Sequence, residues 1–302
     1  MTSLRSRIVL LAGVALKATA AAMVPVGETM VAQNNFPKPP GIERLDPALD
    51  QLVAPDAVIE VLAGGYDWTE GPVWIKDGGY LLFSDIPPNQ IHRWKEGEGA
   101  KLYLMPSGYT GTEKRGGEVG SNGLTVDREG RLVLAQHGDR RIARMDAPLS
   151  KPQPKFTTLA DRYQKARLNS PNDLVFRSNG DIYFTDPAYG MEKQWDDPKR
   201  EMDYAGVFRR TPDGTVTLLT KEMTRPNGIA FSPDERRLYV AQSDQNAAIW
   251  RVFDVKSDGT IENSRILLDV TTLGKSRRGL PDGMKIDTAG NLFATGPGGV
   301  LV

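Results

Sequence analysis

The chain has 302 residues, and its 38 Lys and Arg residues balance 38 Asp and Glu residues, so the formal net charge is zero. This balance provides no basic excess for binding nucleic acid or a membrane surface. The lack of cysteine excludes disulfides, thiolate metal sites and a cysteine nucleophile, and only two histidines, His92 and His137, are present. The 31 Gly and 21 Pro residues indicate many turns, which favour many short strands.

The N-terminus has the pattern of a secretory signal. Arg5 and Arg7 precede an apolar run at 8–16, and small residues follow at 18–22. The apolar run is too short to span a bilayer as a helix. We therefore predict a signal peptide over residues 1–33, a Pro- and Asp-rich linker over 34–56, and a periplasmic or secreted protein.

A strand-like hexamer recurs about every fifty residues. Its second position is always Leu or Ile and its fifth position is always small. The five copies are YLLFSD at 80–85, RLVLAQ at 131–136, DIYFTD at 181–186, RLYVAQ at 237–242 and NLFATG at 291–296. Alternating apolar and polar segments lie between them. Repeated all-β units of this length, with about four strands each, predict the blades of a β-propeller over residues 57–302.

An acid or amide stands about ten residues upstream of each hexamer, just before the apolar stretch expected to form the innermost strand. These residues are Glu70, Asn122, Asn172, Asn227 and Asp282, at intervals of 52, 50, 55 and 55. In a propeller the innermost strands converge on the central axis. The repeat therefore predicts five oxygen-bearing side chains in one place.

Carboxylate and amide oxygens, without thiolate or imidazole, suit a hard cation. We expect one divalent cation; the ligand set favours Ca²⁺, and Mg²⁺, Mn²⁺ and Zn²⁺ are alternatives. Such an ion can polarise a substrate carbonyl, and a neighbouring carboxylate can act as a general base. The structural alternative is an ion that only holds the blades together.

Six motifs, in this order and spacing, carry a resemblance to a known family. They are EGPVW at 70–74, SNGL at 121–124, SPNDLVF at 170–176, YFTDPAYG at 183–190, RPNGIAFSPD at 225–234 and PDGMKID at 281–287. From about Trp68 to the C-terminus the chain resembles the gluconolactonase, senescence-marker-protein (regucalcin) and luciferin-regenerating-enzyme family. The resemblance implies a six-bladed propeller with one axial divalent cation, often calcium, and hydrolysis of lactones, typically sugar lactones.

The resemblance also implies roles for individual residues. Glu70, Asn172, Asn227 and Asp282 match the metal ligands, and Asp282 matches the group that accepts and donates the proton. Asn172 also matches a substrate contact. We expect Asp173 and Asn122 to be further substrate contacts, with bracing of the loop as the alternative for Asp173. The chain departs from the animal sugar lactonases at Ser170, where those proteins carry a substrate-binding Arg, which affects substrate identity more than the reaction.

Other functions have weaker support. A serine hydrolase lacks a Gly-x-Ser-x-Gly motif here. A paraoxonase-like lactonase would need both His92 and His137, which are more simply structural. A non-catalytic binding propeller would keep the fold but would not need the ring of acids and amides. The alternative to an enzyme is a non-catalytic calcium-binding propeller that acts as a ligand-binding module. The polar loop at 191–203 either covers the mouth of the pocket or is a solvated insertion.

The fifth repeat begins at Leu280, and the sequence stops at Val302, after its first strands. We therefore expect a C-terminally incomplete propeller of about four and a half blades, in which all the proposed metal ligands are present. The strand-like segment 58–62 would complete the last blade of a full ring.

Overall fold

The computed structural model describes residues 41–302, which divide into a unit ending at Thr69 and a second unit, Glu70–Val302. In the first unit, the short 3-10 helix η1 (Pro47–Gln51) begins where the Asp46 side chain accepts a hydrogen bond from the Ala48 amide at 2.8 Å. The predicted signal peptide lies outside the described residues, as does the first part of the predicted linker. No helix in the described range is long and apolar enough to cross a membrane.

The segment 58–62 does not form the expected strand. It belongs to none of the sheets in the described part of the chain, and only Glu60 makes an isolated bridge. Val58 is exposed. An alternating sequence becomes a strand only when a neighbouring strand pairs with its backbone, and the sheets of residues 41–302 do not extend to this segment.

Five sheets follow one another along the second unit, each built from consecutive strands; four have four strands and the fifth has three. The first contains β1 (Thr69–Ile75), β2 (Tyr80–Asp85), β3 (Gln90–Lys95) and β4 (Gly99–Leu104), and the second contains β5 (Ser121–Val126), β6 (Leu132–Gln136), β7 (Arg141–Met145) and β8 (Phe156–Ala160). The third contains β11 (Leu174–Phe176), β12 (Ile182–Asp186), β13 (Gly206–Arg210) and β14 (Val216–Thr220), and the fourth contains β15 (Pro226–Phe231), β16 (Arg237–Asp244), β17 (Ala247–Val255) and β18 (Ile261–Asp269). The fifth contains β19 (Met284–Ile286), β20 (Leu292–Gly296) and β21 (Gly299–Leu301). The remaining elements are the hairpin of β9 (Arg162–Tyr163) and β10 (Ala166–Arg167), and the 3-10 helices η2 (Gln194–Asp196) and η3 (Leu273–Lys275).

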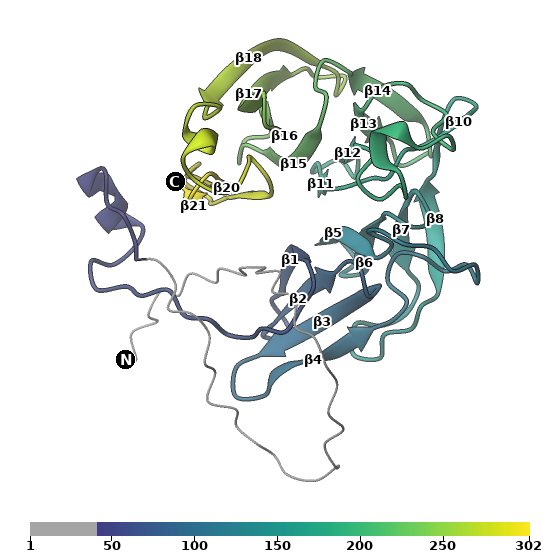
Figure 1. The fold of residues 1–302 in the computed structure, drawn as a ribbon, viewed down its shortest axis with the longest axis horizontal. Coiled ribbons are helices and arrows are strands. Elements are labelled where there is room, and N and C mark those ends of the chain that lie inside the picture. Colours follow the sequence, from purple (N-terminus) through teal and green to yellow (C-terminus); the bar gives the residue numbers. More distant parts are fainter. Residues whose placement is uncertain (1–40) are drawn as a thin grey trace. The chain divides into compact units, whose positions relative to one another are not determined.

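The sheets of this unit succeed one another around a common centre, with β1, β5, β11 and β15 on the inner side and β4, β8, β14 and β18 on the outer side (Figure 1). The prediction of an all-β propeller is therefore confirmed, and the described residues contain five blades. The five repeated hexamers coincide with the second strands, β2, β6, β12, β16 and β20. The sixth blade expected from the family stays a prediction.

The apolar cores lie between successive sheets. Neighbouring residues of β12 point to opposite faces, so Phe184 enters a core shared with the second sheet while Tyr183 enters a core shared with the fourth. In β6, Val133 and Leu134 divide in the same way. Every residue of β12 and β6 is consequently buried. This burial on both faces explains why the hexamers are apolar at adjacent positions.

The acid or amide position of the repeat lies at a bulge, where two residues of the inner strand face one residue of the second strand. In the second sheet, Asn122 and Gly123 of β5 both face Ala135 of β6. The fourth sheet repeats this arrangement at Asn227 and Gly228. A bulge bends the strand and changes the direction of its side chains. Here it takes each amide side chain out of the regular alternation of its strand.

Backbone hydrogen bonds produce the same arrangement in the third and fifth sheets. The Asn172 amide donates to the Thr185 carbonyl at 2.9 Å, and the Thr185 amide donates to the Asp173 carbonyl at 3.0 Å. The equivalent pair of bonds around Thr295 measures 3.0 Å each. The residue facing the bulge is the fifth position of the hexamer, so it is small because two backbone units crowd it.

A glycine directly follows the repeated acid or amide at Asn122 and Asn227, and it lets the inner strands of successive blades approach closely. A Cβ atom on Gly123 would lie 2.7 Å from the Asn172 carbonyl oxygen, and one on Gly228 would lie 2.3 Å from the Asp282 carbonyl oxygen. Both distances are shorter than any van der Waals contact, and the obstructing atoms are backbone. Glycine is required because the neighbouring blade occupies the space of a side chain.

We expect Gly228→Ala to lower the free energy of unfolding by about 2–3 kcal/mol, since overpacking against backbone forces a shift between blades. Gly116→Ala is the matched control, because a Cβ at Gly116 meets nothing within 4 Å. Urea denaturation of both variants measures the difference. Equal stability of the two variants would contradict the close packing of inner strands.

Candidate functional site

The five predicted ring residues occupy consecutive positions around the inner strands of the second unit. Glu70 lies in β1 directly before Gly71, and a Cβ on Gly71 would come within 2.2 Å of the Asn122 carbonyl oxygen. The contact of Gly123 with Asn172 continues the series. The Thr185 hydroxyl then donates to the Asn227 carbonyl at 2.8 Å. The contact of Gly228 with the Asp282 carbonyl completes the series. Each ring residue therefore follows its predecessor in space as well as in the repeat.

Asp173 stands where the other repeats have glycine, and its carboxylate links two blades. Its Oδ1 accepts a hydrogen bond from the Leu174 amide at 2.8 Å, and its Oδ2 accepts one from the Ile229 amide of β15 at 3.2 Å. Burial raises the pKa of Asp173, while Lys285 and these two amides oppose the rise. The contacts are those of a brace between the third and fourth blades, and the role of Asp173 as a substrate contact stays a prediction.

The amides of the ring are buried and only partly satisfied. Asn172 is 2% exposed, and its Oδ1 has no hydrogen-bond partner among the described residues. Asn227 donates from Nδ2 to the Ser243 hydroxyl at 2.9 Å. A buried acceptor without a partner costs free energy unless another group satisfies it. The Asn172 oxygen is therefore available to accept a contact from a ligand.

Negative charge accumulates at Asp282. This residue keeps part of its surface exposed, but the protein around its carboxyl group raises its pKa well above the usual value. Burial is the main cause, repulsion from Asp173 is the second, and Glu118 adds a smaller repulsion; hydrogen bonds from Gly283 and Asn227 oppose them. A carboxylate that is repelled by its neighbours gains most from a cation placed among them.

These residues fit a hard divalent cation. No group of three His, Cys, Asp and Glu side chains suited to a metal occurs in residues 41–302. The predicted set is instead two carboxylates, Glu70 and Asp282, with the amides of Asn172 and Asn227. Oxygen donors of this kind suit calcium. A cation bound here would satisfy the unpartnered Asn172 oxygen and offset the repulsion of Asp282 by Asp173 and Glu118.

Three side chains that the repeat did not predict lie near the site: Tyr189, Trp195 and Arg225. Burial raises the pKa of Tyr189, a hydrogen bond with Ser243 opposes the rise, and Asp282 and Glu118 add repulsion. Tyr189 also packs edge-on against Trp195 at a centroid distance of 4.9 Å, and the Arg225 guanidinium lies over the Trp195 ring at 4.5 Å. The loop 191–203 thus contributes Trp195 to the surroundings of Tyr189.

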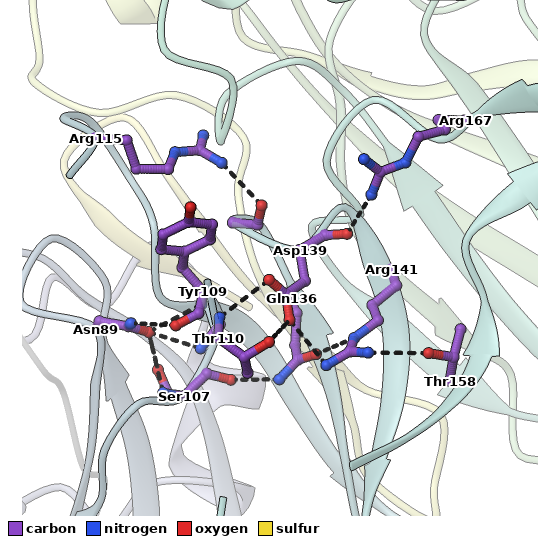
Figure 2. A network of polar contacts seen from close by, with 12 residues as sticks. Asn89, Ser107, Tyr109, Thr110, Arg115, Gln136, Asp139, Arg141, Thr158 and Arg167 are labelled. Carbon is purple, nitrogen blue, oxygen red and sulfur yellow. Dashed lines mark hydrogen bonds and ion pairs between the residues drawn. The ribbon is translucent and has the colours of Figure 1, made fainter. Parts of the chain in front are cut away.

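The segment 105–120 between the first two sheets is fixed by a polar network (Figure 2). The Asn89 Oδ1 accepts hydrogen bonds from the amides of Ser107, Gly108 and Tyr109 at 3.0, 2.7 and 3.2 Å. Its Nδ2 donates to the Tyr109 carbonyl at 2.8 Å. Further along, the Thr110 amide and hydroxyl donate to the Asp139 carboxylate. One amide side chain therefore organises the start of a long loop that leads to Glu118.

Comparison with known proteins places the chain among lactonases. Residues 68–302 match the profile described as the SMP-30/Gluconolactonase/LRE-like region. The chain belongs to this family. A gluconolactonase from Zymomonas mobilis is 40% identical over 94% of this chain and 83% of its own.

Solved structures agree. A gluconolactonase from Xanthomonas campestris superposes with a TM-score of 0.65 at 32% identity, over 79% of this chain and 73% of its own. A calcium-binding regucalcin from Agrobacterium tumefaciens shares the fold, with a TM-score of 0.57 at 18% identity over 78% and 69% of the two chains. The two gluconolactonases confirm the prediction of a lactone-hydrolysing enzyme, and the regucalcin structure supports the fold.

The departure of this family member at Ser170 has a structural explanation. The Ser170 hydroxyl donates to the Pro187 carbonyl at 2.7 Å and accepts from the Gly190 amide at 3.0 Å. Its own amide donates to Asp186, whose pKa is raised to about 7 by burial. Ser170 is fully buried. Its side chain therefore holds the turn that carries Tyr189.

The two histidines lie in different blades of the second unit, His92 in a strand and His137 in a turn. His92 in β3 stacks on Phe83 at 5.7 Å and contacts Gln90 through Nε2 at 3.0 Å. His137 follows β6, is fully buried, and lies beside Glu118 with Nδ1 3.4 Å from a carboxylate oxygen. His137 therefore neighbours Glu118 of the candidate site, whereas His92 packs against Phe83 of its own sheet.

We expect Asn89→Ala to release the start of the 105–120 segment, because three amides lose one shared acceptor. Hydrogen exchange at residues 107–109 should speed up by at least about tenfold, the equivalent of roughly 1.4 kcal/mol of local stability. Asn89 has a φ of 62°, which Asp tolerates, so Asn89→Asp is the matched control that keeps the acceptor. Equal exchange in both variants would contradict this role.

Proposed function

We propose that this protein is a metal-dependent lactonase that opens sugar lactones, as the name gluconolactonase implies for its relatives. The single observation that carries the proposal is the buried Asn172 amide oxygen without a partner, beside the mutually repelling carboxylates of Asp282 and Asp173. Perturbed buried groups of this kind cluster at functional sites of proteins.

The ligands proposed for the cation are Glu70, Asn172, Asn227 and Asp282. When bound there, a divalent ion, with calcium preferred by the oxygen donors, would polarise the lactone carbonyl. Asn122 is proposed as a substrate contact, because it occupies the same position of the repeat in β5.

Asp282 is proposed as the proton-transfer group. Its carboxylate takes a proton from the water that adds to the carbonyl carbon. It returns that proton to the ring oxygen as the carbon–oxygen bond breaks, so the product is the open hydroxy acid. A carboxylate placed at the cation can take and return a proton within the same site.

We expect Glu70→Gln and Asp282→Asn each to weaken calcium binding at least about 100-fold, because even an outer partner of a metal ligand can cost that much. Isothermal titration calorimetry measures the affinity. Glu192→Gln is the matched control, since Glu192 is exposed in the 191–203 loop. Unchanged binding in both ligand variants would contradict the assignment.

We further expect Asp282→Ala to reduce kcat for lactone opening by about 10²–10⁴-fold, with a cooperative unfolding transition retained. Proton release from a panel of lactones, with calcium, magnesium, manganese and zinc compared after chelation, measures the activity. A protein that binds the metal but opens no lactone on this panel would be a binding module.

A further inference from the structure

Glu118 occupies a position beside the candidate site that none of the proposed roles uses. It lies four residues before Asn122, at the end of the 105–120 segment, with 28% of its side chain exposed. The His137 ring next to it is fully buried, and neither ring nitrogen makes a hydrogen bond within the described residues. The Nδ1 atom lies 3.4 Å from the Glu118 carboxylate. The partly exposed Glu118 carboxylate therefore lies next to the buried His137 imidazole.

The backbone around this pair is fixed on the side of His137. Its amide donates to the Gly120 carbonyl at 3.1 Å, and the next amide, of Gly138, donates to the Val119 carbonyl at 3.2 Å. These two bonds pair the turn after β6 with the residues that directly follow Glu118. The carboxylate therefore has a defined place instead of moving with a free loop.

Arg115 joins the turn after β6 to the turn that carries Tyr189. The Arg115 guanidinium donates to the Gly138 carbonyl at 2.8 Å and to the Gly190 carbonyl at 2.7 Å. A Cβ atom on Gly190 would lie 2.3 Å from the Cβ of His137, so the turn packs directly on the imidazole. Segments from three parts of the chain consequently meet around Glu118.

Glu118 lies close to the turn that carries Tyr189, because the His137 ring beside its carboxylate packs on Gly190. Its charge also acts on Asp282 and Tyr189. A partly exposed carboxylate and a phenol are therefore available at one wall of the candidate site. A carboxylate accepts hydrogen bonds only, and the hydroxyls of a sugar ring are the donors that match it.

We infer that Glu118 is a substrate-binding residue that accepts hydrogen bonds from the ring hydroxyls of a polyhydroxylated lactone, and that His137 is its positioning residue. The inference rests on the proposed lactonase function and assigns it a substrate class.

The test compares two lactones of equal ring size, glucono-δ-lactone and hydroxyl-free δ-valerolactone, at saturating calcium. Glu118→Gln should raise KM for glucono-δ-lactone about tenfold or more, since a hydrogen bond to a charged group is lost. Its kcat/KM for δ-valerolactone should stay within about twofold, because that ring presents no hydroxyl to Glu118. Glu113→Gln, an exposed acid of the same segment, is the matched control and should change neither value.

His137 is tested through a double-variant cycle. His137→Gln should raise KM for glucono-δ-lactone in the native background and add nothing in the Glu118→Gln background, whereas a purely structural role predicts additive effects. Additive effects would overturn the positioning role. If His137→Gln does not unfold cooperatively, hydrogen exchange of the Gly120 amide is measured in Glu118→Gln instead. Unchanged exchange supports the role of Glu118 in substrate binding, and faster exchange shows a structural role and overturns the inference.

Binding of 1,5-anhydroglucitol, a sugar ring without a carbonyl, separates this inference from the proposed function. Calorimetric binding that Glu118→Gln weakens about tenfold supports hydroxyl recognition, even if the native protein opens no lactone. Lactone opening with an unchanged KM in Glu118→Gln overturns the inference and leaves the proposed function standing. Equal loss on both lactones also overturns it.

Discussion

The close contact between successive inner strands is the constraint on which the rest of this structure depends. In the second and fourth blades, two residues of the inner strand face one residue of the second strand, and the glycine of that pair lies against the backbone of the next blade. In the third blade Asp173 stands in place of the glycine, and its carboxylate binds the Ile229 amide of the neighbouring strand. One local geometry therefore serves both purposes: it joins the blades, and it turns the preceding acid or amide out of the sheet.

The same geometry concentrates polar groups where the protein cannot satisfy them alone. The buried Asn172 oxygen lacks a partner, and Asp282 is repelled by Asp173. Such a centre lowers the stability of the empty protein, because buried polar groups and like charges cost free energy. Binding a cation or a substrate would recover that free energy. Stability and function are in this way coupled at the ring.

The walls of the site follow a different principle. They come from connections that do not repeat: the 105–120 segment, the turn after β6 and the turn at Ser170 and Gly190. Each is held by hydrogen bonds to backbone atoms, such as those of Asn89 and Arg115. Loops of this kind can change between relatives without disturbing the ring, which allows one reaction centre to serve different substrates.

The sequence by itself determined the propeller, its second strands and the positions of Glu70, Asn172, Asn227 and Asp282, because all of these depend on a local pattern that repeats about every fifty residues. Tertiary structure alone decided the rest. Nothing in the sequence around Glu118 indicates that His137 lies behind it, or that Ser170 holds the turn of Tyr189 instead of facing a substrate. These contacts join segments of different, non-repeating loops. Their geometry arises only when the blades pack, since no periodicity in the chain encodes which loops then meet.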